Sequence, residues 1–165
     1  MVMEQVRPQK TYILPLDELY KAAPDISWSS APRITSNLSP TEVCQILGEW
    51  YKNNSSEAHR HDAGQFFTPR IVARYMANQA GTLRNQMRIL DPGAGVGILA
   101  CAVCELAKMQ QLSELTIIAY EPDPVLFLLC SFALNYARDF LHEDGLKLLI
   151  EVHQQDFLEA MAMQL

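Results

Sequence analysis

The sequence predicts an α/β fold with a parallel sheet, and two observations lead to this prediction. Residues 88–99 read Arg88-Ile-Leu-Asp-Pro-Gly-Ala-Gly-Val-Gly-Ile-Leu99, an apolar strand that passes through a glycine-rich turn into a helix. From Met87 onward, strand patterns alternate with helix patterns, which is typical of parallel strands joined by helical crossovers. The predicted fold is therefore a Rossmann-like half sheet. The length of 165 residues, with 49% hydrophobic and 19% charged residues, fits one globular domain.

The N-terminal part divides into two segments. Residues 1–38 contain several prolines and serines and no sustained apolar period, which predicts an extended arm. Residues 39–82 form a helical segment. Ser39-Pro-Thr-Glu42 has the pattern of a capping box with proline at the first helical position, so a helix is expected over 40–52. Its apolar face would consist of Val43, Ile46, Leu47 and Trp50.

A second helix is expected over 69–80, with Thr68 as its N-cap and Pro69 as its first residue. Residues 83–165 then form the half domain. We expect strands over 87–91, 115–121 and 147–153, with helices over 97–110 and 123–138 between them. The pattern stops after the third strand, so the predicted sheet is truncated there.

The glycine-rich turn is the first candidate site. Gly93, Gly95 and Gly97 permit positive backbone torsions and a close approach of main-chain N–H groups to a ligand above the helix N-terminus. Asp91 ends the preceding strand, where its carboxylate can accept hydrogen bonds from the turn or contact a cationic ligand, or simply cap the turn.

Three further positions carry side chains suited to a nucleotide-like ligand. Glu121 ends the second strand, where an acid can accept both ribose hydroxyls. Asp156 follows the third strand and can accept from an adenine amino group, with Phe157 against the base. In Gly64-Gln-Phe-Phe-Thr-Pro69, Thr68 offers a hydroxyl at a helix start, and the two phenylalanines offer a ring to adenine or pack in the core.

The remaining composition limits the alternatives. Cys101 and Cys104 form a C-x-x-C pair, but no second ligand pair follows, so we expect buried thiols and no metal site. His153 is expected to be a strand residue, and His59 and His61 lie in a polar loop. A net charge of −6 gives no basic footprint for nucleic acid. The sequence has neither a signal-peptide pattern nor an apolar run near membrane-span length, so we expect a cytoplasmic protein.

These motifs together resemble the DNA amino-methyltransferases that methylate N6 of adenine, in the order found in type I modification subunits. Gly64-Gln-Phe-Phe-Thr-Pro69 is similar to the family's upstream motif, Leu90-Asp-Pro-Gly-Ala-Gly-Val-Gly97 to its glycine-rich motif, Glu121 to its ribose-binding acid and Asp156-Phe157 to its adenine-binding pair. The resemblance covers roughly residues 40–158. It implies an S-adenosylmethionine-dependent methyltransferase fold with S-adenosyl-L-methionine as cofactor. The cofactor-binding residues would be Phe67, Thr68, Pro69, Asp91, Pro92, Gly93, Ala94, Gly95, Gly97, Glu121, Pro122, Asp156 and Phe157.

One departure from the family pattern limits the expected activity. The family's catalytic tetrapeptide, Asn or Asp followed by Pro-Pro and an aromatic residue, does not occur in the sequence, so no catalytic residue is assigned. DNA contacts would come from segments absent from this chain. In this fold a fourth strand pairs beside the first, so the strand around Ile89 and Leu90 is expected to be an open sheet edge. Such an edge favours self-association or a partner subunit, unless the N-terminal arm covers it.

Three functional hypotheses follow. The first is the cofactor-binding portion of a DNA adenine methyltransferase, within a restriction-modification or related system, that is inactive as an isolated chain. The second is a methyltransferase-like interaction or regulatory subunit that a partner completes. The third is half of an NAD-binding oxidoreductase domain, in which the Asp-Pro and Phe-Phe-Thr-Pro segments are unexpected. Because the tetrapeptide distinguishes adenine from cytosine targets, the target base stays open.

Overall fold

The computed structural model describes residues 9–56 and 67–163. Its central element is a parallel sheet in the order β3-β4-β5, made of Met87–Asp91, Glu114–Tyr120 and Lys147–His153. All three predicted strands are confirmed, two with the expected bounds and one shifted by a single residue. The register pairs Asp91 with Ala119 and Tyr120 with His153, so the carboxyl ends of the strands meet along one edge of the sheet.

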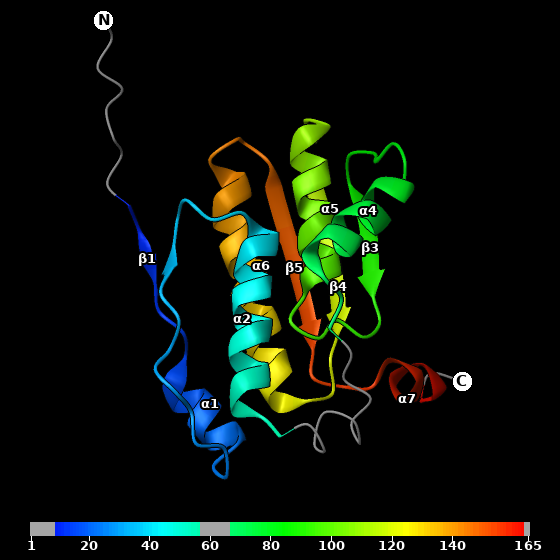
Figure 1. Cartoon of the computed structure of the whole chain (residues 1–165). Helices are drawn as coiled ribbons and strands as arrows, with labels where there is room; N and C mark the ends of the chain where they lie inside the picture. Colours follow the sequence, from blue (N-terminus) through cyan, green and yellow to red (C-terminus); the bar gives the residue numbers. More distant parts are fainter. Residues whose placement is uncertain (1–8, 57–66, 164–165) are drawn as a thin grey trace, which may run out of the picture.

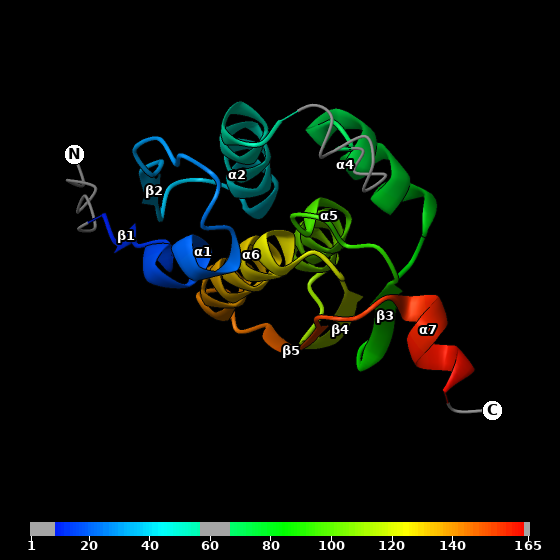
Figure 2. The ribbon, with the colours of Figure 1, turned by 90° about the horizontal axis from the view of Figure 1, so that it is seen from below.

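Helices cover one face of this sheet in two layers (Figures 1 and 2). Helices α5, Ile98–Met109, and α6, Pro124–His142, pack directly on the sheet. Helices α2, Pro40–Asn54, and α4, Arg70–Gln79, lie above them, with α2 against α5 and α6 and α4 against α5. The inner face of the sheet is apolar because alternate strand residues such as Leu115, Ile117 and Leu148 point into the core.

The other face of the sheet is bare in the described part of the chain. Leu90 and Leu149 on this face are 47% and 40% exposed, and Arg88 and Glu151 form an ion pair of 3.7 Å across it. Parallel sheets are ordinarily covered by helices on both faces. Helix α7, Phe157–Ala162, follows β5 but lies to the β3 side of the sheet rather than over this face (Figure 2).

The helix termini confirm one predicted cap and correct another. Ser39 and Glu42 form the expected capping box, with Ser39 N–H donating to Glu42 Oε2 at 2.8 Å, and Val43, Leu47 and Trp50 are buried as predicted. Helix α4, however, starts at Arg70 and not at Pro69. Pro69 occupies the N-cap position with an extended ψ of 145°, and no side chain caps the helix, so Thr68 is not the N-cap.

The N-terminal segment differs from the extended arm expected over 1–38. A short antiparallel pair, β1 (Thr11–Tyr12) with β2 (Ile34–Thr35), and helix α1 (Leu16–Ala22) pack against α6. Leu19 and Ile34 are completely buried, so scattered apolar residues without a period suffice to dock this segment. Residues 9–38 lie beside α6, away from β3, so this described part of the segment does not cover the open sheet edge (Figures 1 and 2).

Helix α6 is longer than the predicted 123–138. Of the described residues, only α6 has the length and hydropathy of a membrane-crossing helix, a candidate that the sequence did not lead us to expect. Half of its apolar window is buried, against β5, α2 and α1. Because a buried core helix has the same composition, this single helix is weak evidence for a membrane span.

Candidate functional site at the carboxyl ends of the strands

The glycine-rich turn leaves β3 at Asp91 and enters α5 at Ile98. Gly95 has a φ of +55° and Gly97 a φ of +83°, a region that favours glycine, and Gly97 is the N-cap of α5. Gly93 is not among the residues with positive φ, so the expected torsion applies to two of the three glycines. The turn is fixed to the next strand because Ala94 N–H donates to Tyr120 O at 3.0 Å.

The three glycines differ in what surrounds them. A Cβ on Gly97 would lie 3.2 Å from Sγ of the buried Cys130, so α6 packs directly under this end of the turn. A Cβ on Gly93 or Gly95 would meet no atom within 4 Å. The turn therefore has one face packed against the core and one open face, on which a ligand can approach the main chain.

Glu121 connects the glycine turn to the end of β4. It is 7% exposed, and its two carboxylate oxygens accept hydrogen bonds from Gly95 N–H at 2.8 Å and from Asp123 N–H at 3.0 Å. Burial raises the pKa of Glu121, an effect that these two hydrogen bonds partly offset. Each carboxylate oxygen can accept a second hydrogen bond, so these contacts leave acceptor capacity for ligand hydroxyls.

Asp91 is the second buried acid of the site and is also 7% exposed. Burial raises its pKa, while hydrogen bonds from the N–H groups of Gly93 and Ala100 act in the opposite direction. Its Oδ2 atom is buried and has no hydrogen-bond partner among the described residues. An unpaired buried oxygen is unfavourable in a folded protein and calls for an explanation, such as an absent polar or cationic ligand.

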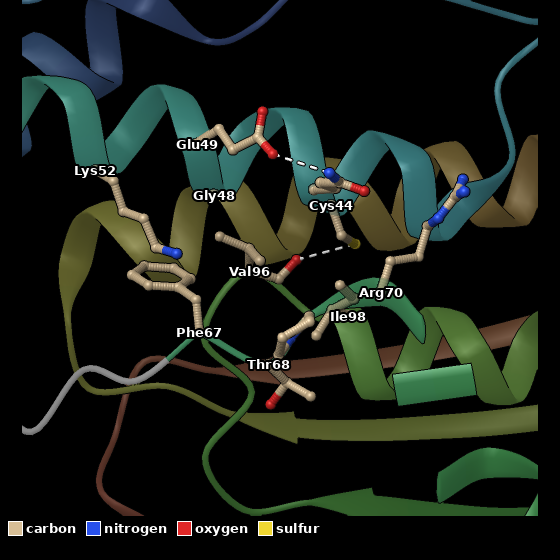
Figure 3. A pocket seen from close by; sticks show the side chains of 11 residues that line it. Cys44, Gly48, Glu49, Lys52, Phe67, Thr68, Arg70, Val96 and Ile98 are labelled. Atoms are coloured by element: carbon tan, nitrogen blue, oxygen red, sulfur yellow. Dashed lines mark hydrogen bonds between the residues drawn. The ribbon is translucent and has the colours of Figure 1, made fainter. Parts of the chain in front are cut away.

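The segment 67–70 lies against α2, next to Val96 of the glycine turn (Figure 3). Phe67, Thr68 and Pro69 line a cavity of about 200 Å³ together with Val96 and Gly48. The Phe67 ring lies 5.8 Å from the Tyr51 ring and 4.7 Å from Lys52 Nζ, and a Cβ on Gly48 would reach it at 3.4 Å. These contacts agree with the core-packing role expected of Phe67, and its ring also lines the cavity.

The third group of predicted residues lies beyond β5. Asp156 Oδ1 accepts hydrogen bonds from Leu158 N–H at 2.8 Å and Glu159 N–H at 3.0 Å, so Asp156 is the N-cap of α7. It shares a cavity of about 470 Å³ with Pro122. The Phe157 ring contacts Tyr120 edge-on at 5.3 Å, and His153 stacks on the other side of Tyr120 at 4.6 Å.

The structure thus brings some predicted residues together and keeps others apart. The glycine turn, Asp91 and Glu121 form one unit, and the 67–69 segment reaches it through Val96. Asp91 and Pro92 line an apolar groove along β3, whereas Pro122 and Asp156 line a different cavity. The motif residues Gly64, Gln65 and Phe66, as well as His59 and His61, lie outside the described residues.

Sequence reasoning missed two residues that shape the site. Gly48 lies in the middle of α2, where glycine is unfavourable by about 1 kcal/mol relative to alanine, and this cost was the signal of a close contact. The contact is with Phe67 and Val96. Tyr120, between His153 and Phe157, gave no comparable signal because an aromatic residue in a strand is common.

The four cysteines are buried and carry free thiols, as expected. Burial raises the pKa of Cys104 and Cys130 well above the usual range, which keeps both thiols neutral. Within the described ranges, no three His, Cys, Asp or Glu side chains are placed to hold a metal ion.

A family model described as N-6 DNA methylase matches residues 44–154, about two thirds of the chain. The chain belongs to the N-6 DNA methylase family. The match contains the glycine turn, Asp91 and Glu121, together with the predicted Thr68, and it ends just before Asp156. The fold of this family member agrees with the predicted Rossmann-like arrangement, with a parallel three-stranded sheet and the glycine turn after its first strand.

Two solved structures are similar to this chain. One is described as the modification subunit of a proposed type I restriction enzyme from Vibrio vulnificus YJ016, with 23% identity, a TM-score of 0.48 and 73% of this chain covered. The other is a proposed class I S-adenosylmethionine-dependent methyltransferase from Listeria monocytogenes, with 19% identity, a TM-score of 0.48 and 74% covered. The matches span 25% and 35% of those two chains. No curated protein sequence matches the chain.

Proposed function

We propose that this chain is the S-adenosylmethionine-binding portion of a site-specific DNA methyltransferase that methylates N6 of adenine, within a restriction-modification or related system. One observation carries the cofactor assignment: the buried Oδ2 of Asp91, which has no partner among the described residues, lies at the start of a glycine turn whose outer face is open. The Asp91 and Asp123 carboxylates further raise the pKa of Glu121, so negative charge is concentrated at this point. Such a site favours a cation, and S-adenosylmethionine carries a sulfonium and an ammonium group.

The residues of the site fit this cofactor. Asp91 would accept from its ammonium group, the main chain of Gly93 and Gly95 would approach it closely, and Glu121 would accept from the ribose hydroxyls with its remaining lone pairs. We further propose that Asp156 Oδ2 accepts a hydrogen bond from the adenine amino group of the cofactor and that Thr68 contacts the carboxylate of the cofactor. When bound, the cofactor supplies a methyl group on a positively charged sulfur. A pyrophosphate, as in NAD, would instead meet the Asp91 carboxylate, which disfavours the oxidoreductase hypothesis.

We propose that the chain as given does not transfer methyl groups by itself. The Asn/Asp-Pro-Pro-aromatic tetrapeptide, which by family resemblance holds the target amino group, is absent from the sequence. DNA would be bound through segments outside this chain, since the net charge here is −6. The four buried thiols favour a reducing, cytoplasmic location.

Calorimetric titration of the purified chain with S-adenosylmethionine tests the cofactor proposal, with NAD titrated in parallel. We expect saturable binding of S-adenosylmethionine alone, and loss of binding in Glu121→Ala. Glu18→Ala, an exposed acid on α1, is the matched control and should bind like the wild type. Binding of NAD, or equal binding by Glu121→Ala, would contradict the proposal.

The open edge of β3 favours the alternative in which a second polypeptide completes the domain. In the described part of the chain, β3 pairs with β4 alone. Beside it lie an apolar groove, lined by Met76, Ile89 and Leu99 among others, and exposed residues of α4, of which Ile71 is 79% and Tyr75 64% exposed. Unpaired strand edges with apolar surroundings template pairing with another chain. We propose that the isolated chain self-associates through this edge, which sedimentation velocity at rising concentration would detect.

A further inference from the structure

Helix α5 carries a buried carboxylate that the proposed function does not use. Glu105 is the only acidic residue in α5 and is 7% exposed. Its Oε1 accepts hydrogen bonds from Thr41 N–H at 2.9 Å and from Thr41 Oγ1 at 2.7 Å. Its Oε2 lies 3.0 Å from Arg74 Nε. One carboxylate thus joins three helices: α5, the first turn of α2, and α4.

Stability alone does not account for this arrangement. Burying an ion pair costs desolvation that its attraction barely repays, and well-packed apolar residues in its place are often as stable. What a buried carboxylate with fixed partners supplies is a single relative placement of the groups that it joins. Here those groups are two long helices and the N-terminus of a third, whose free N–H groups favour an anion.

The two helices that Arg74 and Glu105 join begin at the two halves of the candidate cofactor site. Helix α4 starts immediately after Thr68 and Pro69, and α5 starts immediately after Gly97. Arg70, one turn before Arg74 on α4, forms a second ion pair with Glu42 of α2 at 2.6 Å. Any rotation or slide of α4 on α5 would separate the Arg74–Glu105 ion pair and displace Thr68 relative to the glycine turn.

We propose that Glu105, with Arg74, is a positioning pair that sets Thr68 against the glycine turn and thereby tunes affinity for the methyl donor. This proposal rests on the proposed function, because it assigns Thr68 and the glycine turn to one ligand. Neither Glu105 nor Arg74 contacts that ligand. The pair acts through the placement of α4.

Arg74→Met is the main variant, because Arg74 is half exposed and its loss leaves the core intact. Arg84→Met removes an exposed arginine before β3 and is the matched control. Each variant is assayed for S-adenosylmethionine affinity by calorimetry, for its urea midpoint, and for amide hydrogen exchange in α4. Glu105→Gln, which keeps the Thr41 contacts but loses the charge toward Arg74, is the second variant.

We expect Arg74→Met and Glu105→Gln to weaken affinity about tenfold, as small misplacements of binding groups do, and to accelerate α4 exchange. Arg74→Met leaves the buried Glu105 charge without its cation, so its urea midpoint should fall, whereas Glu105→Gln removes that charge and should keep a higher midpoint. Arg84→Met should match the wild type. Wild-type affinity in either variant, or an affinity loss confined to the variant with the lower urea midpoint, would overturn the proposal. If the wild-type chain binds no S-adenosylmethionine, the proposed function fails by itself. In that case amide exchange in α4 tests the positioning pair separately. Unchanged exchange in Arg74→Met would reject the placement of α4 by this pair, and faster exchange would support it.

Discussion

The three glycines of the turn should respond differently to alanine, and Gly97 should respond most. A Cβ at Gly97 meets two penalties, a φ of +83° and a contact of 3.2 Å with Cys130 Sγ. The left-handed conformation costs an L-residue about 1–2 kcal/mol. Overpacking in a well-packed core costs about 1–3 kcal/mol, and alanine returns about 0.4–1 kcal/mol by restricting the unfolded chain. We therefore expect Gly97→Ala to lower the free energy of unfolding by about 3 kcal/mol.

The other two glycines separate these contributions. Gly95 has a φ of +55° but open space around its Cβ position, so Gly95→Ala should cost only about 1 kcal/mol, the backbone penalty less the unfolded-state gain. Gly93 has neither penalty, so Gly93→Ala should leave stability unchanged or slightly higher. Because its new methyl group would project toward the proposed ligand, Gly93→Ala should nevertheless weaken S-adenosylmethionine binding.

Urea unfolding followed by circular dichroism measures all three variants at one pH, and calorimetry measures their affinity. Cys130→Ala alone and combined with Gly97→Ala closes a double-mutant cycle, in which a coupling above about 0.5 kcal/mol isolates the contact with sulfur. If Gly97→Ala proves no less stable than Gly95→Ala, the packing of Cys130 under the turn is not as described. If Gly93→Ala loses several kcal/mol, its surroundings are not open.

Three further predictions concern burial, charge and the sheet edge. Tyr136 holds the N-terminal segment, because its hydroxyl lies 2.6 Å from Leu38 O, to which it donates, and 3.0 Å from Thr35 O. Burial raises the pKa of Tyr136 to about 12. Tyr136→Phe should cost about 1–2 kcal/mol in urea unfolding and increase proteolysis of that segment, and intact protection would contradict this. Burial raises the pKa of Asp91, so its ionised form is disfavoured in the folded chain. The free energy of unfolding of the wild type should fall as the pH rises through the folded pKa of Asp91. The stability of Asp91→Asn relative to the wild type should therefore increase from about pH 4 to pH 7, and a constant difference in pH-dependent unfolding would be evidence against the raised pKa. Leu90→Lys should reduce self-association in sedimentation without lowering the urea midpoint, because Leu90 is 47% exposed, and undiminished association would place the contact elsewhere.

The sequence was sufficient where one local pattern determines the structure. The apolar runs that end in Asp91 and precede Glu121 predicted β3 and β4, and Ser39 with Glu42 predicted the start of α2. In these cases the determinants lie within a few residues of each other. Among these elements, the end of a helix, as at His142, was less predictable, because it depends on contacts that the local sequence does not contain.

Long-range contacts determined what the sequence did not reveal. Leu19 and Ile34 lack any periodic neighbours, and their burial against α6 follows only from the completed fold. The contacts of Glu105 with Thr41, 64 residues away, could not be read from an apolar helix pattern. The start of α4 is a separate, local case. Thr68 has the residue type of an N-cap, but the backbone at Pro69 is extended, and the helix starts one residue later than predicted.

The candidate site combines features that oppose stability, and this opposition argues for a ligand. Asp91 and Glu121 are both buried with raised pKa values, and Asp91 also leaves an oxygen unpaired among the described residues. A turn needed only to connect β3 to α5 would be more stable with an asparagine at position 91, which keeps an acceptor for the Gly93 and Ala100 N–H groups without a buried charge. A cation bound there would instead lower both pKa values and stabilise the ionised forms, so ligand binding and folding are coupled through the same carboxylates. Two of the three carboxylates that are buried in the described part of the chain thus lie where the open face of Gly93 and Gly95 admits a ligand, and the third, Glu105, is paired with Thr41 and Arg74. That distribution is the one expected of a ligand-binding site and supports the proposed cofactor.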